Sequence, residues 1–174
     1  MEIYSRQFGL IIAYILPGFI ALVGVAPLLP LVALWLRPLS NGIELGPPIY
    51  ALLAATAVGM IVSCFRWLLI DPLLRLTGVP QSVSNYRLLE DKLEAVNYLV
   101  EAHYRYYQFY ANALIGILFA YLVNRFLHTS MLLGFGTDLG VLILCAVLLA
   151  GSRDALSKYR HRSHQLAAKV VEKV

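Results

Sequence analysis

The chain has 174 residues, of which 60% are apolar and only 14% are charged, and its formal net charge is +4. A water-soluble domain of this length needs far more charge to cover its surface, and its core does not require apolar residues in long blocks. The composition therefore excludes an ordinary soluble domain and predicts one membrane domain with a modest cytoplasmic part.

Four apolar stretches are long enough to cross a hydrocarbon core about 30 Å thick, which needs about 20 helical residues. They are residues 8–36, 49–70, 109–127 and 131–150. The first stretch is long and is interrupted by Pro17, Pro27 and Pro30, so we expect a kinked or tilted helix or a short amphipathic lead-in, with a re-entrant hairpin as the alternative. The predicted fold is all-α, an integral membrane protein of about four transmembrane helices.

The basic residues are distributed very unequally between the two sides of this predicted domain. Only Arg37 and Arg125 lie on one side, whereas the N-terminus, residues 71–108 and the residues after 151 carry most of the others. Because basic residues stay on the cytoplasmic side, both termini and the 71–108 segment are predicted to face the cytoplasm of a bacterial cell. The chain is thus expected to be a multi-pass protein of the inner membrane, in contact with membrane lipids.

The third predicted helix extends beyond the membrane. No helix breaker occurs between Asn85 and His128, which predicts one helix of about 40 residues and about 60 Å, half of it cytoplasmic. The chain then divides into residues 1–70 with the first two transmembrane helices, 71–108 with a turn and the helical extension, 109–151 with the last two transmembrane helices, and a basic amphipathic tail, 152–174.

The cytoplasmic half of this helix carries an apolar stripe with alternating spacings of four and three residues, which is a heptad pattern. Its members are Leu89, Leu93, Val96, Val100, His103 and Tyr107. Such a stripe needs a partner, either the C-terminal helix of the same subunit or copies of the chain around an axis. We favour the copies, with a tetramer as the working guess, because the chain offers little other soluble mass. His103 within the stripe either fixes register, responds to pH or is simply packed.

A second stripe, of amide and small side chains, runs along the third span at intervals of four residues, through Asn112, Gly116 and Asn124. Such residues either hold helices together in lipid or line a wet path, so these three are candidate pore-lining residues. Asp138, which lies among glycines, joins them if the fourth span begins at Met131, but is a loop residue if it begins later. In span two, Arg66 is expected to snorkel, to pair with an acid or to gate.

The tail is predicted to form a basic amphipathic helix beside the membrane. Clustered cations attract anionic lipids, and they also attract oligonucleotide phosphates. The candidate polyanion-binding residues, proposed on charge alone, are Arg105, Arg153, Lys158, Arg160 and Arg162.

Catalytic signatures are not found in the sequence. It has no phosphate-binding loop, nucleophile elbow or zinc-spaced ligand set, and His161-x-x-His164 is a weak metal pattern within a basic tail. Cys64 and Cys145 lie in apolar runs and are expected to pack as small hydrophobic residues. We therefore predict no catalytic residue, no metal and no cofactor.

Residues 101–112 (EAHYRYYQFYAN), with LPGF at 16–19 and the 59–67 segment upstream, resemble a group of small bacterial four-span proteins. In size and layout the chain is similar to membrane effectors of anti-phage operons, such as that of the Hailong system. The resemblance implies a homo-oligomeric channel held shut by DNA oligomers from a partner nucleotidyltransferase. Two alternatives stay open: a non-catalytic scaffold that docks a soluble partner through the 85–108 helix, and an enzyme acting on lipid through His103 and Glu101.

Overall fold

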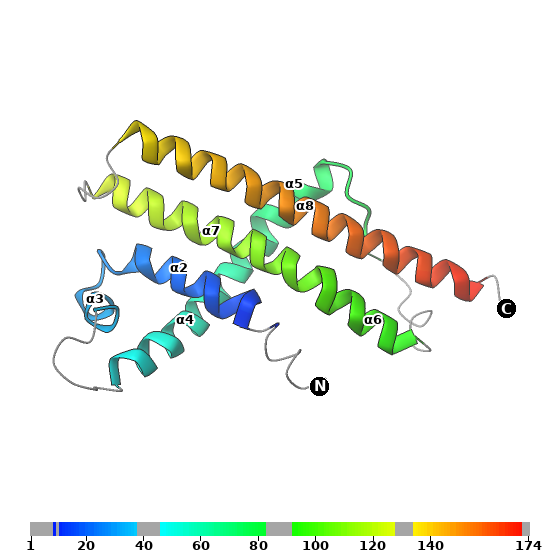
Figure 1. The fold of residues 1–174 in the computed structure, drawn as a ribbon, viewed down its shortest axis with the longest axis horizontal. Coiled ribbons are helices and arrows are strands. Elements are labelled where there is room, and N and C mark those ends of the chain that lie inside the picture. Colours follow the sequence, from blue (N-terminus) through cyan, green and yellow to red (C-terminus); the bar gives the residue numbers. More distant parts are fainter. Residues whose placement is uncertain (1–8, 10, 38–45, 83–91, 128–133, 172–174) are drawn as a thin grey trace.

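The computed structural model describes residues 9, 11–37, 46–82, 92–127 and 134–171, and this part of the chain is helical without strands (Figure 1). Three of the elements are π-helical turns, marked η. In chain order the elements are η1 (Ile11–Ile15), α2 (Leu16–Val25), α3 (Pro30–Trp35), α4 (Gly46–Phe65), η2 (Arg66–Ile70), α5 (Asp71–Leu76), α6 (Leu93–Leu99), η4 (Val100–Tyr104), α7 (Arg105–Phe126) and α8 (Phe135–Val171).

Several elements join end to end into longer helices. Three of these are long and apolar enough to cross a membrane: Gly46–Leu76, Leu93–Phe126 and Phe135–Ala168, with 31, 34 and 34 residues. A shorter apolar helix covers Ile11–Val25. The all-α class and the presence of several membrane-spanning helices predicted from composition are consistent with this architecture.

The first predicted span, residues 8–36, differs from the expectation. It is not one kinked helix, because the helix Ile11–Val25 ends in a turn and Pro30 starts the separate helix α3 after an extended Leu29. Proline has no N–H to donate and fits the first turn of a new helix, which explains the position of this break. At 1.5 Å per residue the fifteen-residue first helix is about 22 Å long, shorter than a full hydrocarbon core.

The long third helix is continuous from Leu93 to Phe126, with η4 inside it, while the expected start near Asn85 lies outside the described residues. The last membrane helix and the basic tail form a single helix, α8, of 37 residues and about 55 Å. The expected start of span four at Met131 also lies outside the described residues. The boundary expected between residues 151 and 152 falls inside α8 without a break.

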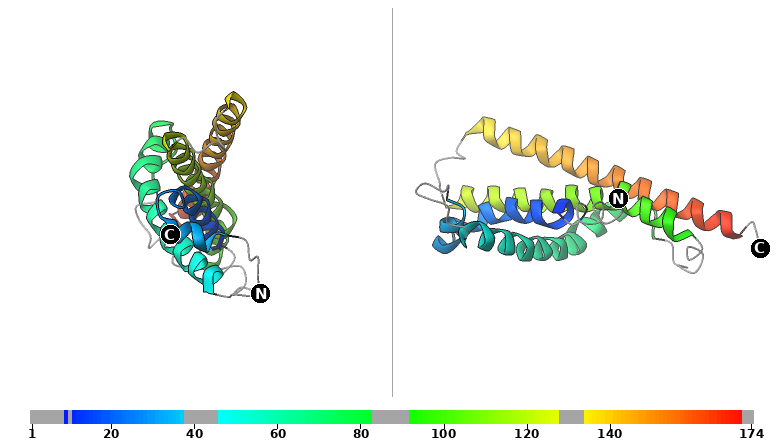
Figure 2. Two further views of the ribbon diagram at one scale, coloured as in Figure 1. Left: turned by 90° about the vertical axis from the view of Figure 1, so that its left-hand side faces the viewer. Right: turned by 60° about the horizontal axis from the view of Figure 1, so that its bottom comes forward.

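The helix α7 is the centre of the molecule, with α2 on one side and α8 on the other (Figures 1 and 2). Helices α2 and α4 cross at two glycines, where a Cβ atom added to Gly18 would lie 1.8 Å from the Ala55 carbonyl oxygen and one added to Gly59 would lie 2.1 Å from that of Tyr14. Backbones in lipid approach this closely only when no side chain intervenes. The small residues of span two therefore form a packing face.

The membrane part of α8 is much less covered. Of the residues in its most apolar stretch only 11% are buried inside the molecule, compared with 33% in the Leu93–Phe126 helix. Its exposed side chains include Leu142, Ile143 and Val147, and the helix diverges from α7 toward its own N-terminal end (Figure 2). This half of α8 presents an apolar surface to lipid or to another protein surface.

Candidate functional site

Side chains from the three π-helical turns meet near the beginning of α7. Tyr14 comes from η1, Arg66 from η2 and Tyr104 from η4, and each contacts another polar residue there. We call this set the polar layer: Tyr14, Arg66, Asp71, Glu101, Tyr104, Arg105, Tyr107 and Gln108. Single π-helical turns inside α-helices occur frequently at functional sites. The polar layer is therefore the candidate functional site.

Arg66 is the most unusual member of the polar layer, since only 6% of the residue is exposed. Its guanidinium lies 5.1 Å from the ring centre of Tyr107, and it also interacts with the side chain of Tyr104. Its Nε and Nη1 atoms have no hydrogen-bond partner, and no carboxylate of the described residues lies within ion-pair distance. Burying a cation is costly; the attraction of the more distant Asp71 carboxylate and a cation–π contact of about 2 kcal/mol offset part of that cost.

Tyr107 and Asp71 join the end of span two to the start of α7. The Tyr107 hydroxyl donates a hydrogen bond to Asp71 Oδ1, and Tyr107 itself is fully buried. Its ring centre lies 5.7 Å from that of Tyr104, whose ring in turn lies 5.0 Å from that of Tyr159 on α8. Tyr104 and Tyr107 therefore connect the end of span two, the third helix and α8, and do not only face the lipid interface.

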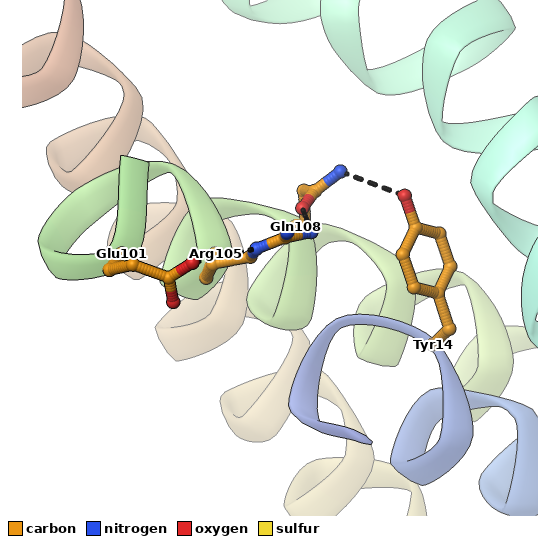
Figure 3. A network of polar contacts seen from close by, with 4 residues as sticks. All are labelled: Tyr14, Glu101, Arg105 and Gln108. Atoms are coloured by element: carbon orange, nitrogen blue, oxygen red, sulfur yellow. Dashed lines mark hydrogen bonds and ion pairs between the residues drawn. The ribbon is translucent and has the colours of Figure 1, made fainter. Parts of the chain in front are cut away.

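A second chain of contacts leads from η4 and the start of α7 to η1 (Figure 3). Arg105 Nε lies 3.8 Å from Glu101 Oε1, and Arg105 Nη1 donates to Gln108 Oε1 at 3.3 Å. Gln108 Nε2 donates to the Tyr14 hydroxyl at 3.2 Å. Arg105, a candidate for binding a polyanion, thus already has an acid and an amide as partners within the chain.

The candidate pore-lining residues lie in three different places. Asn112 is fully buried between α7 and η1, and its Nδ2 donates to the Ala13 carbonyl at 2.7 Å. In an α-helix the donor to that carbonyl is the N–H of residue 17, but residue 17 is a proline. Ala13 lies in the π-helical turn η1, where the usual donor is one residue later, so the Asn112 amide is an added donor beside a proline that cannot donate.

Gly116 lies one turn farther along, where an added Cβ would be 3.1 Å from the Pro17 carbonyl oxygen, so it belongs to the same helix contact. Asn124 donates to the Ala120 carbonyl of its own helix at 2.8 Å. Asp138 is in the first turn of α8, where it accepts from the Tyr121 hydroxyl at 2.7 Å and lies 3.5 Å from Arg125 Nη2. The structure therefore does not gather these candidates around one path within a single chain.

The heptad stripe has an intrachain partner over part of its length. Val96 packs against Leu166 and Ala167 of α8, and His103 Nε2 lies 2.8 Å from Arg162 Nη1. Tyr107 is buried as described, Val100 is half-buried, Leu93 is 64% exposed and Leu89 lies outside the described residues. Val96 and His103 of the stripe thus contact α8, as expected for the alternative in which the C-terminal helix is the partner. Association of copies through this stripe stays a prediction.

The C-terminal half of α8 holds the Thr77–Gln81 segment with side chains spaced seven and four residues apart. Arg153 donates to Thr77 Oγ1 at 3.2 Å and to the Thr77 carbonyl at 3.1 Å, and buried Arg160 donates to the Pro80 carbonyl. His164 Nε2 lies 2.8 Å from the Gln81 carbonyl oxygen. The turn requires Gly78, whose φ of +83° suits glycine. Sequence reasoning from charge alone missed this structural role.

The charges of these cations are compensated to different degrees. Lys158 lies 2.6 Å from Asp154 and is neutralised locally. Arg153, Arg160 and Arg162 instead contact neutral groups, as does Lys92, whose Nζ donates to the Leu166 carbonyl at 3.3 Å. Hydrogen bonds to neutral acceptors leave the positive charge in place, so this end of the molecule keeps a positive field.

His103 lies within this field. Burial lowers the pKa of its imidazole, and the nearby Arg162 and Lys158 lower it further, while Asp154 opposes them.

Among the described residues there is no group of three or more His, Cys, Asp or Glu side chains that could hold a metal ion.

The chain matches no protein-family model, no curated protein and no solved structure. The resemblance to anti-phage membrane effectors therefore stays a prediction from the size and layout of the chain.

Proposed function

We propose that the chain is the subunit of a homo-oligomeric membrane pore, an effector of bacterial anti-phage defence whose opening is controlled by a cytoplasmic polyanion. The polyanion would be an oligonucleotide made by a partner nucleotidyltransferase. In this proposal the short helix Ile11–Val25 is the fourth crossing, so both termini lie in the cytoplasm. One observation carries the proposal: α8 is a single helix that joins the basic cytoplasmic segment to the loosely packed membrane segment.

The sensing end rests on charge. Lys92, Arg153, Arg160 and Arg162 are bonded to neutral partners, so their charges are available to attract phosphates over several ångströms. Several copies around an axis would add their fields.

The conducting path is assigned to the space between copies. Within one chain, Asn112 and Gly116 are occupied in the contact between α7 and the first helix, so they leave no room for water there. The exposed apolar side of α8 offers the surface on which neighbouring copies would pack. A polyanion that moves the cytoplasmic half of α8 would then also move its membrane half, because the helix has no break. Opening collapses ion gradients and requires no chemical step.

The test is ion flux from liposomes that contain the purified full-length chain, with and without a short single-stranded DNA. We expect ion flux in one of the two conditions and a closed pore without flux in the other. Vesicles that stay impermeable in both conditions would rule out the pore.

A pair of variants tests the sensing end separately. Arg162→Gln should weaken the response to DNA, whereas Lys158→Gln, on the same helix, removes a charge that Asp154 already compensates and should weaken it less. Equal responses of both variants would show that only the net charge matters.

A second candidate function, a non-catalytic scaffold or accessory subunit, is favoured by a separate observation. Leu93 and Tyr98 of α6 are 64% and 67% exposed, and they adjoin a cleft of about 540 Å³ between α6 and α8 that Tyr98, Leu99 and Leu166 line. A soluble partner could cover these side chains. If the chain is a scaffold, the purified protein should be a monomer or a dimer, and a bound partner should be recovered with it. The double variant Leu93→Ser with Tyr98→Ser should abolish recovery of that partner.

A further inference from the structure

A groove of about 880 Å³ lies between η1 and α4 on the membrane side of the molecule. Ile15, Met60, Cys64 and Trp67 give it apolar walls, and Met60 and Trp67 are 60% and 66% exposed. Arg66 also lines the groove although only 6% of it is exposed, so it forms part of the floor. The groove therefore combines apolar walls with one buried cation.

The length of the groove corresponds to one leaflet of a bilayer. Its lining on α4 and η2 runs from Thr56 to Trp67, eleven positions and about 16 Å along a helix. Half of a hydrocarbon core is about 15 Å. Arg66 is at the end of the groove nearest Asp71 and the 71–108 segment, which the distribution of basic residues places on the cytoplasmic side.

Two of the hydrogen-bond donors of Arg66 have no partner within the described part of the chain. Tyr107 and Tyr104 contact Arg66, and Asp71 attracts its charge from beyond ion-pair distance, but its Nε and Nη1 atoms lack hydrogen-bond partners. Arginines at this depth pair with other groups or reach toward the headgroups, and a phosphate oxygen is the strongest acceptor that a membrane supplies. After a small shift of the Arg66 side chain, a lipid phosphate would accept hydrogen bonds from its unpaired Nε and Nη1 atoms.

We propose that the groove between η1 and α4 binds one acidic phospholipid of the inner leaflet, with an acyl chain along Met60 and Ile15 and its phosphate on Arg66. This lipid site is separate from the sensing end of the proposed pore and does not depend on whether the protein conducts ions. The bound lipid joins the first helix to α4 at the level of the polar layer.

The test follows the fluorescence of Trp67, which lines the groove. The chain has two tryptophans, so Trp35→Phe leaves Trp67 as the only one. The full-length protein in detergent micelles is titrated with brominated phosphatidylglycerol or brominated phosphatidylcholine, whose bromines quench indole on contact. We expect half-maximal quenching at an about tenfold lower fraction of the acidic lipid, because the choline of phosphatidylcholine neutralises the phosphate that Arg66 would bind, whereas phosphatidylglycerol keeps its net negative charge. Equal quenching by both lipids would overturn the proposal.

Variants and a competitor separate the lipid from other anions. Arg66→Gln should abolish the preference for the acidic lipid, while Arg75→Gln, an exposed arginine in α5, should keep it. A preference that survives Arg66→Gln contradicts the proposal, and so does recovery of the fluorescence on adding inorganic phosphate alone, which would identify a site for free anions. If Arg66→Gln does not fold, Met60→Phe with Cys64→Phe fills the groove and should remove the preference while Arg66 is retained.

Discussion

The contact region of α2, α4 and α7 and the apolar half of α8 both consist of apolar helices, but they are packed very differently. In the first region glycines allow carbonyl groups of neighbouring helices to approach, and buried Asn112 donates a hydrogen bond to the first helix. In the second, exposed Leu142, Ile143 and Val147 dominate, and a Cβ added to Gly136 or Gly140 would have nothing within 4 Å. Tight packing in lipid depends on small residues and on satisfied backbone groups, whereas apolar character alone only places a helix in the membrane.

This difference suggests a division of labour. The contact region holds a fixed arrangement of three helices, and a substitution there is felt by all of them. The apolar half of α8 is largely uncovered within the molecule, whereas its C-terminal half is hydrogen-bonded to residues 77–81. Substitutions in the two regions should therefore have very different effects on stability.

The largest effect is expected at Gly59. A Cβ in this position would lie 2.1 Å from the Tyr14 carbonyl oxygen, so Gly59→Ala forces α4 away from η1 and should destabilise the protein by about 3 kcal/mol or more. The measurement is thermal unfolding of the purified protein in detergent. The matched control is Gly140→Ala in α8, where nothing lies within 4 Å, and its effect should be within about 0.5 kcal/mol. Similar losses in both variants would contradict the comparison.

An intermediate effect is expected at Asn112. Replacing it by alanine leaves the Ala13 carbonyl without this donor in a buried place, which should cost about 1–3 kcal/mol. The neighbouring Pro17 permits a sharper test, because Pro17→Ala restores an N–H at residue 17. In that background Asn112→Ala should be less costly by about 1 kcal/mol, as a double-mutant cycle measures. Additive effects of the two substitutions would show that Asn112 does not compensate for the proline.

Much of the architecture could be predicted from the sequence, because hydropathy blocks and the absence of breakers report directly on helix length. The Leu93–Phe126 helix and the helical tail follow from that rule. For the first span the sequence left a kinked or tilted helix, a short amphipathic lead-in and a re-entrant hairpin open, because its three prolines allow several shapes and the choice depends on tertiary contacts. Trp35 of α3 stacks on Tyr50 of α4 with ring centres 5.8 Å apart, a contact that no local pattern encodes.

The candidate site was much harder to predict. The spacing of Asn112, Gly116 and Asn124 is visible in the sequence, but the hydrogen bond from Asn112 to the Ala13 carbonyl is not. A proline in one helix and an amide in a neighbouring helix are the signal that could have suggested it. Charge alone selected Arg153 and Arg160 without revealing that they bond the backbone of residues 77–80. Such partners are far apart in sequence, so composition and periodicity do not identify them.

The smallest effect is the dependence of stability on pH that comes from His103, which contacts Arg162 in the C-terminal half of α8. Because burial, Arg162 and Lys158 lower the pKa of His103 in the folded protein, the unfolded chain binds a proton more readily near its ordinary value of 6.5. Stability from this group is therefore complete above about pH 6.5 and decreases as the pH falls below it. His103→Gln should reduce this dependence in unfolding measured between pH 8 and pH 5.5, whereas His161→Gln, at an exposed position on α8, should preserve it. If the slope is unchanged in His103→Gln, the contact between His103 and Arg162 does not connect α8 to the third helix in solution.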